Sequence, residues 1–215
     1  VTGLKGIVEQ VFLVFKGNQD STMYVKAWGF EGSGTTPPEP QKPFGGTAWA
    51  IPGKIEMENF DEPGTGRGAG VDSYNENDSE NHGDSDLREG TGVDLYKKAT
   101  GVIVGYNQAG EWLEYTVNVK EAGDYTMFAA VASANSTSGF QLSIDGENIT
   151  DAIAVPQASS GEENYDDYNK VSANVKLPAG EHILRFTVTG GWMDIDYINL
   201  VAGKDGEDTD PLEGT

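Results

Sequence analysis

Carboxylates are the most abundant chemically active side chains of this chain, with 35 Asp and Glu against 14 Lys and Arg in 215 residues. Glu56 and Glu58 stand two positions apart in a run that reads as a strand, so both side chains should point to the same face. Like charges on one face repel unless a cation lies between them, and oxygen atoms are the ligands that Ca²⁺ prefers. The spacing fits either a calcium site or a polar strand edge that faces water.

Paired carboxylates can also hydrolyse glycosidic bonds. That chemistry needs one acid with a raised pKa and a second carboxylate about 5 or about 6.5–9.5 Å away. With 35 acids in the chain, pairs arise by chance, so their presence alone carries little information. A small, loop-rich domain also leaves little room for a deep cleft that excludes water. We therefore predict no catalysis by this chain, with a glycoside hydrolase fragment as the alternative.

Aromatic residues beside turns are the third group of interest: Tyr106, Trp112, Tyr165, Tyr168 and Trp192. Sugar rings bind where an aromatic plane meets their C–H face and polar side chains meet their hydroxyls. Aromatic residues in turns also commonly fasten loops to the core, and we expect this for Trp112 and Tyr168. Tyr106 and Tyr165 have surroundings too polar for burial and are predicted to bind a sugar.

Composition excludes several other function classes. The chain has no Cys, which removes disulfides and thiolate zinc sites, and its only histidines are His82 and His182. No apolar run approaches the roughly 18 residues that a membrane-spanning helix requires. A net charge of −21 repels phosphate backbones and anionic lipids, which argues against nucleic acid and membrane partners.

The chain divides by composition into four parts. Residues 1–31 hold two apolar runs and read as the last strands of a preceding module, and residues 32–53 are a Pro/Gly/Thr-rich linker. Residues 54–202 form the main domain, and residues 203–215 are an acidic linker. Because the chain begins at Val1 without a leader or initiator Met, we expect it to be a fragment of a larger secreted protein.

Alternating apolar and polar residues predict that the main domain is all-β. Residues 111–119 place Leu113 and Tyr115 on one face and Glu114 and Thr116 on the other. An Asp-Gly pair after residues 140–145 signals a hairpin turn. Further strands are expected at 125–133, 171–177, 182–188 and 192–201. Short strands with frequent turns are typical of a β-sandwich.

Ordered motifs run through residues 54–201. They include the Val-Gly-Tyr-Asn-Gln-Ala-Gly-Glu-Trp-Leu-Glu-Tyr run, and they occupy residues 55–60, 74–83, 92–95, 104–115, 177–186 and 192–200. In order and spacing the segment resembles a family 6 carbohydrate-binding module, a non-catalytic domain appended to polysaccharide hydrolases. The resemblance implies a jelly-roll, galactose-binding-like sandwich of two antiparallel sheets. Residues 1–31 resemble the final strands of a similar module.

The resemblance also implies a binding site in the loops at one edge of the sandwich. There, two aromatic rings, Tyr106 and Tyr165, would enclose a sugar, and Asp194 would contact its hydroxyls. The family usually has Trp in place of Tyr165 and Asn in place of Asp194. Tyr offers a smaller stacking face than Trp, and an ionised Asp accepts hydrogen bonds but cannot donate them. Glu76 and Asn81 would lie in the loop that rims this site.

Two further expectations complete the site. Trp192, which opens the last motif, joins the predicted carbohydrate-binding residues. The structural calcium ion of the family would be held by Glu56, Glu58 and Asp196, together with backbone carbonyls.

We therefore expect a secreted, calcium-stabilised module that binds polysaccharide or oligosaccharide. It would anchor a tethered plant-polysaccharide hydrolase and so raise the local substrate concentration. Xylan or arabinoxylan is the first predicted ligand, followed by β-glucan. Two alternatives stay open: a fragment of a hydrolase such as an arabinofuranosidase or xylanase, and a calcium-stabilised spacer whose sugar site has decayed.

Overall fold

The computed structural model describes residues 41–62, 73–77, 80–99, 101–158 and 165–209. The two strands expected within residues 1–31, and residues 32–40 of the linker expected at 32–53, lie outside the described residues. The resemblance of residues 1–31 to a second module therefore stays a prediction.

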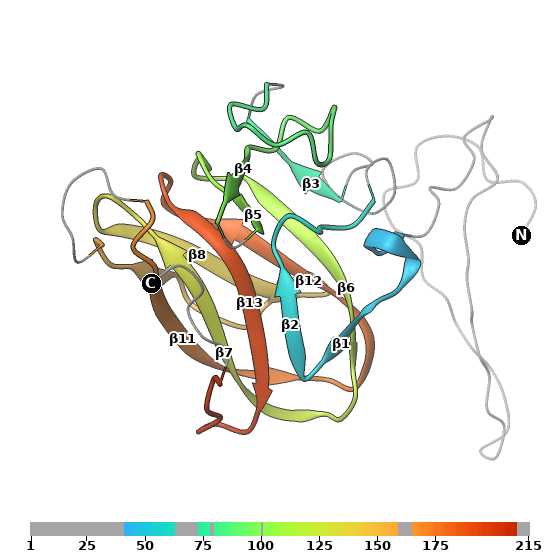
Figure 1. Cartoon of the computed structure of the whole chain (residues 1–215). Coiled ribbons are helices and arrows are strands. Elements are labelled where there is room, and N and C mark those ends of the chain that lie inside the picture. The colour runs from blue at the N-terminus through green and yellow to red at the C-terminus, as the bar shows by residue number, and fades with distance from the viewer. Residues whose placement is uncertain (1–40, 63–72, 78–79, 100, 159–164, 210–215) are drawn as a thin grey trace, which may run out of the picture. The chain divides into compact units, whose positions relative to one another are not determined.

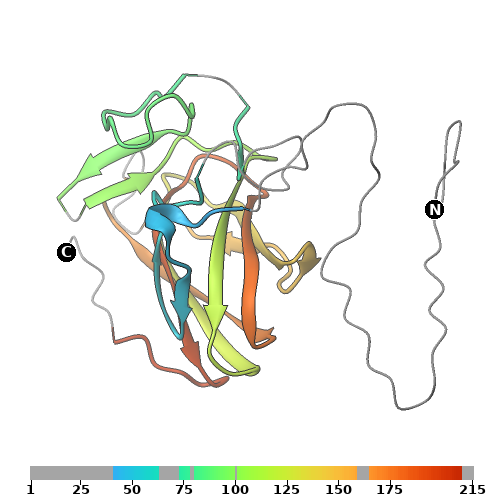
Figure 2. The same cartoon turned by 90° about the vertical axis from the view of Figure 1, so that its right-hand side faces the viewer.

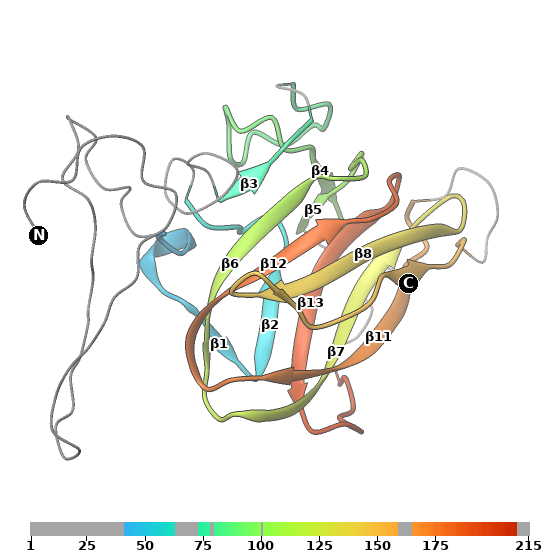
Figure 3. The same cartoon turned by 180° about the vertical axis from the view of Figure 1, so that it is seen from behind.

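Two β-sheets confirm the all-β sandwich, and within the described ranges the first sheet has seven strands (Figure 1). Its main order is β1-β6-β12-β8-β10, with β3 paired to β6 and β9 paired to β8. The strands are β1 (Trp49–Ile51), β3 (Tyr74–Asn75), β6 (Trp112–Val119), β8 (Thr137–Ile144), β9 (Glu147–Asn148), β10 (Ile153–Val155) and β12 (Gly180–Val188). Figure 3 shows β6, β12 and β8 side by side in this sheet.

The second sheet has six strands in the described part of the chain, in the order β11-β7-β13-β5-β4, with β2 paired to β13. They are β2 (Gly53–Glu56), β4 (Leu95–Lys98), β5 (Gly101–Val104), β7 (Gly123–Ala132), β11 (Asn169–Leu177) and β13 (Asp194–Ala202). The quarter turn of Figure 2 shows β2 and β6 in separate layers. The long strands expected from alternation are all present, with shifted ends.

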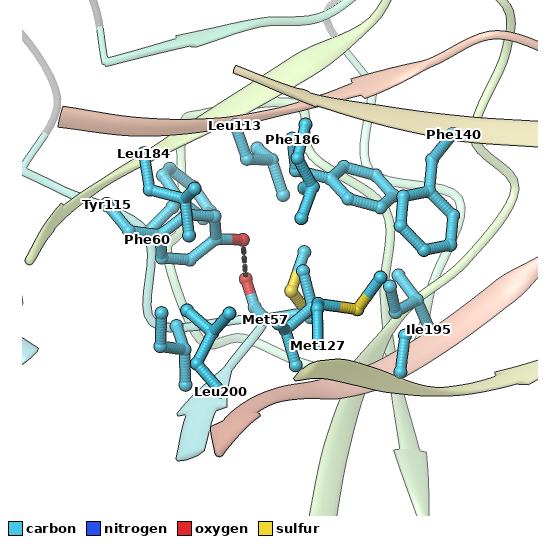
Figure 4. Packing of buried hydrophobic residues seen from close by; sticks show 14 of the residues in the cluster. Met57, Phe60, Leu113, Tyr115, Met127, Phe140, Leu184, Phe186, Ile195 and Leu200 are labelled. Carbon is cyan, nitrogen blue, oxygen red and sulfur yellow. Dashed lines mark hydrogen bonds between the residues drawn. The ribbon is translucent and has the colours of Figure 1, made fainter. Parts of the chain in front are cut away.

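The core between the sheets is built from the alternate apolar residues of their facing sides. Phe140 and Phe186 pack at a ring separation of 4.8 Å, and both are fully buried. Figure 4 shows how these rings and their neighbours from the first sheet meet Met127, Ile195 and Leu200 of the second. Each such side chain contributes about 1.5–3 kcal/mol on burial, so this interior supplies the main driving force for folding.

The Asp-Gly pair forms the hairpin turn that the sequence predicts. Asp145 and Gly146 adopt φ values of 48° and 87° between β8 and β9, and Ile144 pairs with Glu147 across the turn. Asp-Gly accepts these left-handed conformations at low cost. The expected hairpin is therefore confirmed.

The side of β6 opposite the core is also covered. Glu114 and Thr116 lie there as expected, but they are only 4% and 3% exposed. The Asp61 carboxylate accepts hydrogen bonds from the Thr116 amide at 2.8 Å and its hydroxyl at 2.6 Å, and Arg185 Nε donates to Glu114 at 2.7 Å. Polar alternation thus gives the face of each residue correctly, but not its exposure.

The sandwich extends beyond both predicted boundaries. Strand β1, within the expected linker 32–53, pairs in parallel with Val117–Val119 of β6, so the domain starts before residue 54 and its first sheet is not purely antiparallel. At the other end, Asp208 accepts a hydrogen bond from Asn199 at 2.8 Å and pairs with Lys170 at 2.7 Å. The first residues of the expected linker 203–215 are therefore part of the folded module.

Within the described ranges, no helix has the length and apolar character needed to cross a bilayer.

Candidate functional site

A pocket of about 440 Å³ opens where the second sheet meets its connecting loops. Four predicted site residues line it together: Tyr106, Tyr165, Trp192 and Asp194. Two further lining residues, Tyr96 and Lys98, come from β4. Segments that are far apart in the sequence therefore converge on one cavity.

Aromatic rings dominate the wall of this pocket. Tyr106 is 49% exposed and Trp192 is 58% exposed, and they are the large apolar side chains that remain exposed in the described part of the chain. Their centroids lie 5.8 Å apart with the planes at 66°, while Tyr96 stacks on Tyr106 at 5.5 Å and 19°. Exposed rings held at different angles offer flat apolar surfaces to a ligand with C–H faces.

The backbone holds the two exposed rings in unusual conformations. Tyr106 has φ 49° and Trp192 has φ 64°, in the left-handed region that bulky residues rarely adopt. Such residues cost of order 1–3 kcal/mol each and persist only where the surrounding structure fixes them. The contacts that hold Tyr106 and Trp192 in this conformation come from Asn107.

Asn107 ties the two ring-bearing loops together. Its carbonyl accepts the Trp192 amide at 2.9 Å, and its side-chain amide donates to the Met193 carbonyl at 2.6 Å. Gly191 permits this approach, because a Cβ there would lie 2.7 Å from the Asn107 carbonyl oxygen. We call this arrangement the Asn107 clamp. It sets the positions of Tyr106 and Trp192 through main-chain atoms and the Asn107 side chain.

Glu111, further along the same motif, has a structural role. It is 4% exposed, and its carboxylate accepts the Gln108 amide at 2.6 Å, which closes the loop that carries Tyr106. The Gly110 amide donates to Val188 at 2.9 Å and joins this loop to the end of β12. The Gly-Tyr…Gly-Glu-Trp motif thus builds the loop that presents one aromatic ring.

The polar floor of the pocket is an ion-pair cluster. Lys98 Nζ lies 3.4 Å from Asp194 Oδ2 and 2.7 Å from Asp166 Oδ1. Burial raises the pKa of Asp194 to about 6, although the Lys98 ammonium opposes this shift. Burial acts to lower the pKa of Lys98, but Asp166 and Asp194 outweigh it and raise that pKa. The cluster therefore places the Lys98 ammonium between two carboxyl groups.

Gly105 is required for Asp194 to reach its position. A Cβ at residue 105 would lie 2.6 Å from Asp194 Oδ1 and 3.1 Å from the Tyr96 ring. The glycine before Tyr106 thus lets the loop backbone lie against the floor of the pocket.

Two predicted rim residues are not among the residues that line this pocket. Asn81 accepts the Gly83 and Leu95 amides at 2.7 and 3.2 Å and donates to the Ser85 carbonyl at 3.0 Å, so it shapes its own loop. Glu76 instead lies beside Glu111, and burial together with that carboxyl raises the pKa of Glu76 to about 9. Both expectations came from the family resemblance, which indicates the loop but not the direction in which each side chain points.

Trp112 and Tyr168 fasten structure to the core, as predicted. Trp112 is 6% exposed, with the Arg185 guanidinium 4.0 Å from its ring centroid. Tyr168 is 9% exposed and packs with Tyr197 and two alanines.

Sequence reasoning missed Tyr96 and Lys98. A signal was present, because the two residues are two apart in a strand and so share one face. What the sequence did not show is that this face looks onto Asp194, which is distant along the chain.

The three predicted calcium ligands line one smaller cavity. Glu56, Glu58 and Asp196 surround about 180 Å³ beside β2 and β13. Burial, then the charges of Glu56 and Asp196, raise the pKa of Glu58 to about 7. Its Oε2 atom is buried and has no hydrogen-bond partner among the described protein atoms. The cavity thus gathers carboxylate oxygens, the ligand type that hard cations prefer.

The ammonium of Lys54 lies 3.1 Å from Glu56 Oε1 and would compete with a metal ion for that oxygen. As the side chains stand, no group of three Asp, Glu or His residues in the described ranges could hold a metal ion. Calcium binding would therefore require these side chains to rearrange.

Comparison with known proteins identifies the family. A family model described as carbohydrate binding module (family 6) matches residues 85–202, more than half of the chain. The chain belongs to carbohydrate-binding module family 6. The module is thus a non-catalytic carbohydrate-binding domain. The matched segment contains Tyr106, Tyr165, Trp192 and Asp194.

Solved structures agree with this fold. A family 6 module from Clostridium stercorarium in complex with cellobiose is 18% identical, with a TM-score of 0.54 over 74% of this chain and 99% of that chain. Another family 6 module, whose binding sub-sites were dissected, is 17% identical, with a TM-score of 0.52 over 73% of this chain and 98% of that chain. The C-terminal family 6 module of a marine laminarinase from Zobellia galactanivorans is 20% identical, with a TM-score of 0.49 over 69% of this chain and 97% of that chain. A search of curated proteins finds no match.

Proposed function

We propose that the module binds exposed sugars of a neutral plant polysaccharide in the pocket between Tyr106, Tyr165 and Trp192. One observation carries this proposal: two exposed aromatic rings stand beside the ion pair of Lys98 and buried Asp194 in a pocket of about 440 Å³. The rings suit the C–H faces of a pyranose, and the charged floor suits its hydroxyls. A pocket of this size holds roughly one or two sugar rings.

Charge narrows the ligand class. The chain carries a net charge of −21, which disfavours acidic polysaccharides through long-range repulsion. Xylan or arabinoxylan is our first proposed ligand and β-glucan the second. The complex of the C. stercorarium module with cellobiose supports a neutral β-linked ligand.

We expect weak binding, because one or two stacked sugars supply only a few kcal/mol after the cost of association. Weak binding is sufficient for an anchor, since a tethered hydrolase benefits from raised local substrate concentration rather than from tight capture. We accordingly propose a secreted parent enzyme that carries this module.

Calcium is proposed as a structural ion at Glu56, Glu58 and Asp196. The support is the Oε2 atom of Glu58, which is buried in this cavity without a hydrogen-bond partner among the described protein atoms, together with a pKa of Glu58 that burial raises to about 7. A bound cation would stabilise the ionised carboxylate.

Isothermal titration against xylo-, cello- and laminari-tetraose tests the proposed binding. Tyr106→Asn and Trp192→Asn each remove a ring while accepting the left-handed backbone, so the variants should fold. We expect each to weaken binding by about 30-fold or more. Lys176→Met, on the exposed surface of β11, is the control and should bind as the parent does.

Two results would contradict the proposal. Unchanged affinity in both ring variants would place the sugar elsewhere on the module. No heat with any tetraose, and no retardation in polyacrylamide gels containing xylan, arabinoxylan or mixed-linkage β-glucan, would favour a structural spacer.

A further inference from the structure

A sugar hydroxyl both donates and accepts a hydrogen bond, so a polar floor that orients a sugar needs both kinds of partner. Asp194 supplies only acceptors when it is ionised. The hydroxyl of Tyr96 already donates to the His82 carbonyl at 3.0 Å. The floor therefore needs a donor, and Lys98 is the lining residue whose N–H groups lie beside Asp194, whereas the indole N–H of Trp192 belongs to the aromatic wall.

Lys98 is held in a position to donate. An ammonium has three N–H groups. Two of them have protein partners within reach, Asp166 Oδ1 at 2.7 Å and Asp194 Oδ2 at 3.4 Å. The third remains for a ligand, and the Lys98 side chain keeps 21% of its surface exposed.

Neighbouring contacts keep this lysine in place. The amide of Lys97 donates to Asp84 Oδ1 at 2.7 Å, and β4 pairs with β5 along its length, so the backbone of residue 98 is fixed. Asp166 is 79% exposed at its side chain and lies at the outer end of the cluster, while Asp194 is buried at its inner end. The ammonium thus lies between an outer and an inner carboxylate.

We propose that Lys98 and Asp194 act as one donor–acceptor pair that binds two adjacent hydroxyls of a neutral sugar in this pocket. This inference rests on the proposed function, because it assigns a specificity role within the same site. The cluster of Lys98, Asp166 and Asp194 carries one positive and two negative charges, so it offers no net attraction to an acidic sugar. The pair should therefore select a neutral sugar with a vicinal diol.

A double-mutant cycle tests the pairing. Lys98→Met removes the donors, and we expect it to weaken binding of the best tetraose from the panel by about tenfold. Asp194→Asn supplies a donor and an acceptor from one side chain, because a carboxamide has both. In the Asp194→Asn background, Lys98→Met should change affinity by less than about threefold. Lys98→Arg keeps the donors and should stay within about threefold of the parent.

Folding is monitored by thermal unfolding of every variant, with Lys176→Met as the control for a lysine-to-methionine change at a distant site. The inference is overturned if Lys98→Met weakens binding equally in both backgrounds, or if it has no effect in either. A separate outcome concerns the proposed function: if Tyr106→Asn and Trp192→Asn leave affinity unchanged, the pocket itself is not the binding site. If the ring variants abolish binding and Lys98→Met is inert, only the assignment of the pair fails.

Discussion

The aromatic pocket and the Glu58 cavity present the same electrostatic problem with different solutions. Each contains a buried carboxyl group whose pKa is raised, to about 6 for Asp194 and about 7 for Glu58. In the pocket, Lys98 lies beside that carboxylate. In the cavity, Lys54 contacts Glu56, and one oxygen of Glu58 is left without a hydrogen bond in the described structure.

The difference lies in the source of the compensating charge. A carboxylate that lies beside the chain's own lysine leaves a polar floor with donors and acceptors that a neutral ligand can use. A carboxylate that lacks such a partner favours a cation from solution. The same residue type can therefore serve sugar recognition in one place and ion binding in another.

The largest expected effect comes from removing calcium. If the Glu58 cavity binds Ca²⁺, chelation with EDTA should lower the melting temperature by about 10 °C relative to 1 mM Ca²⁺, because a ligand that binds only the folded state stabilises it by mass action. Differential scanning calorimetry measures this shift. Saccharide affinity at 20 °C should stay within about twofold, because the pocket carries its own cation. If the melting temperatures in EDTA and in calcium are identical, the Glu58 cavity does not take its compensating charge from solution, and it does not differ from the pocket in this respect.

The next largest effect is expected from removing the ammonium group of Lys98. Lys98→Met leaves Asp194 buried beside no ammonium, and we expect a loss of about 2 kcal/mol in the free energy of unfolding at pH 7. Asp194→Asn added to that variant should recover most of the loss, since a neutral amide needs no counter-charge. Urea denaturation gives both values. A stable single variant would show that solvent, rather than Lys98, compensates Asp194.

A smaller effect is expected from Gly105→Ala. Its Cβ would lie 2.6 Å from Asp194 Oδ1, so the loop must shift away from the polar floor. We expect a loss of about 1 kcal/mol in stability and a several-fold weaker affinity. Gly123→Ala is the matched control, because nothing lies within 4 Å of a Cβ there and its φ is not in the left-handed region. Equal behaviour of the two variants would show that the close approach has no consequence.

The smallest effect is a pH dependence of the calcium-free module. Between pH 4.5 and about 7 the folded state keeps a proton on Glu58 that the unfolded chain has lost, so the folded state binds more protons. Its contribution to stability is therefore complete below pH 4.5 and falls by on the order of 1 kcal/mol as the pH rises through 7.

Calcium should remove the Glu58 part of this slope, because it binds the ionised carboxylate, and Glu58→Gln should remove the same part, while the raised pKa of Glu76, about 9, leaves its own fall in place. Asp194 gives a similar fall up to about pH 6 that calcium does not alter, so the two regions are separable in one titration series. Urea denaturation at each pH provides the measurement. A slope that calcium leaves unchanged would argue that no ion binds at Glu58.

Local patterns carried the part of the fold that could be predicted. Period-two alternation located the long strands, because each has one face in the core, and Asp-Gly located the hairpin between β8 and β9. Strand β1 was missed because three residues after a Pro/Gly-rich stretch give no period, and its pairing with β6 depends on distant residues. The burial of Glu114 was missed for the same reason, since Arg185 and the segment around Asp61 cover it.

The residues of the candidate site also divide into those that local patterns predicted and those that depend on long-range contacts. Tyr106, Tyr165, Trp192 and Asp194 were predicted and share one pocket. Tyr106, Trp192 and Asp194 lie in ordered motifs, and Tyr165 stands out as an aromatic residue among polar neighbours. Lys98 depends on its long-range contacts with Asp166 and Asp194, which no local pattern encodes. Asn81 shows the converse: a residue in a promising loop uses its side chain for hydrogen bonds within that loop.

The Asn107 clamp has a consequence for how this module can change. Because the loops at residues 106 and 192 are joined through main-chain atoms and the Asn107 side chain, the side chains at positions 106 and 192 contribute little to holding the loops in place. Libraries that vary both positions should therefore contain many folded members, and selection on different glycans could redirect preference without compensating changes in the interior.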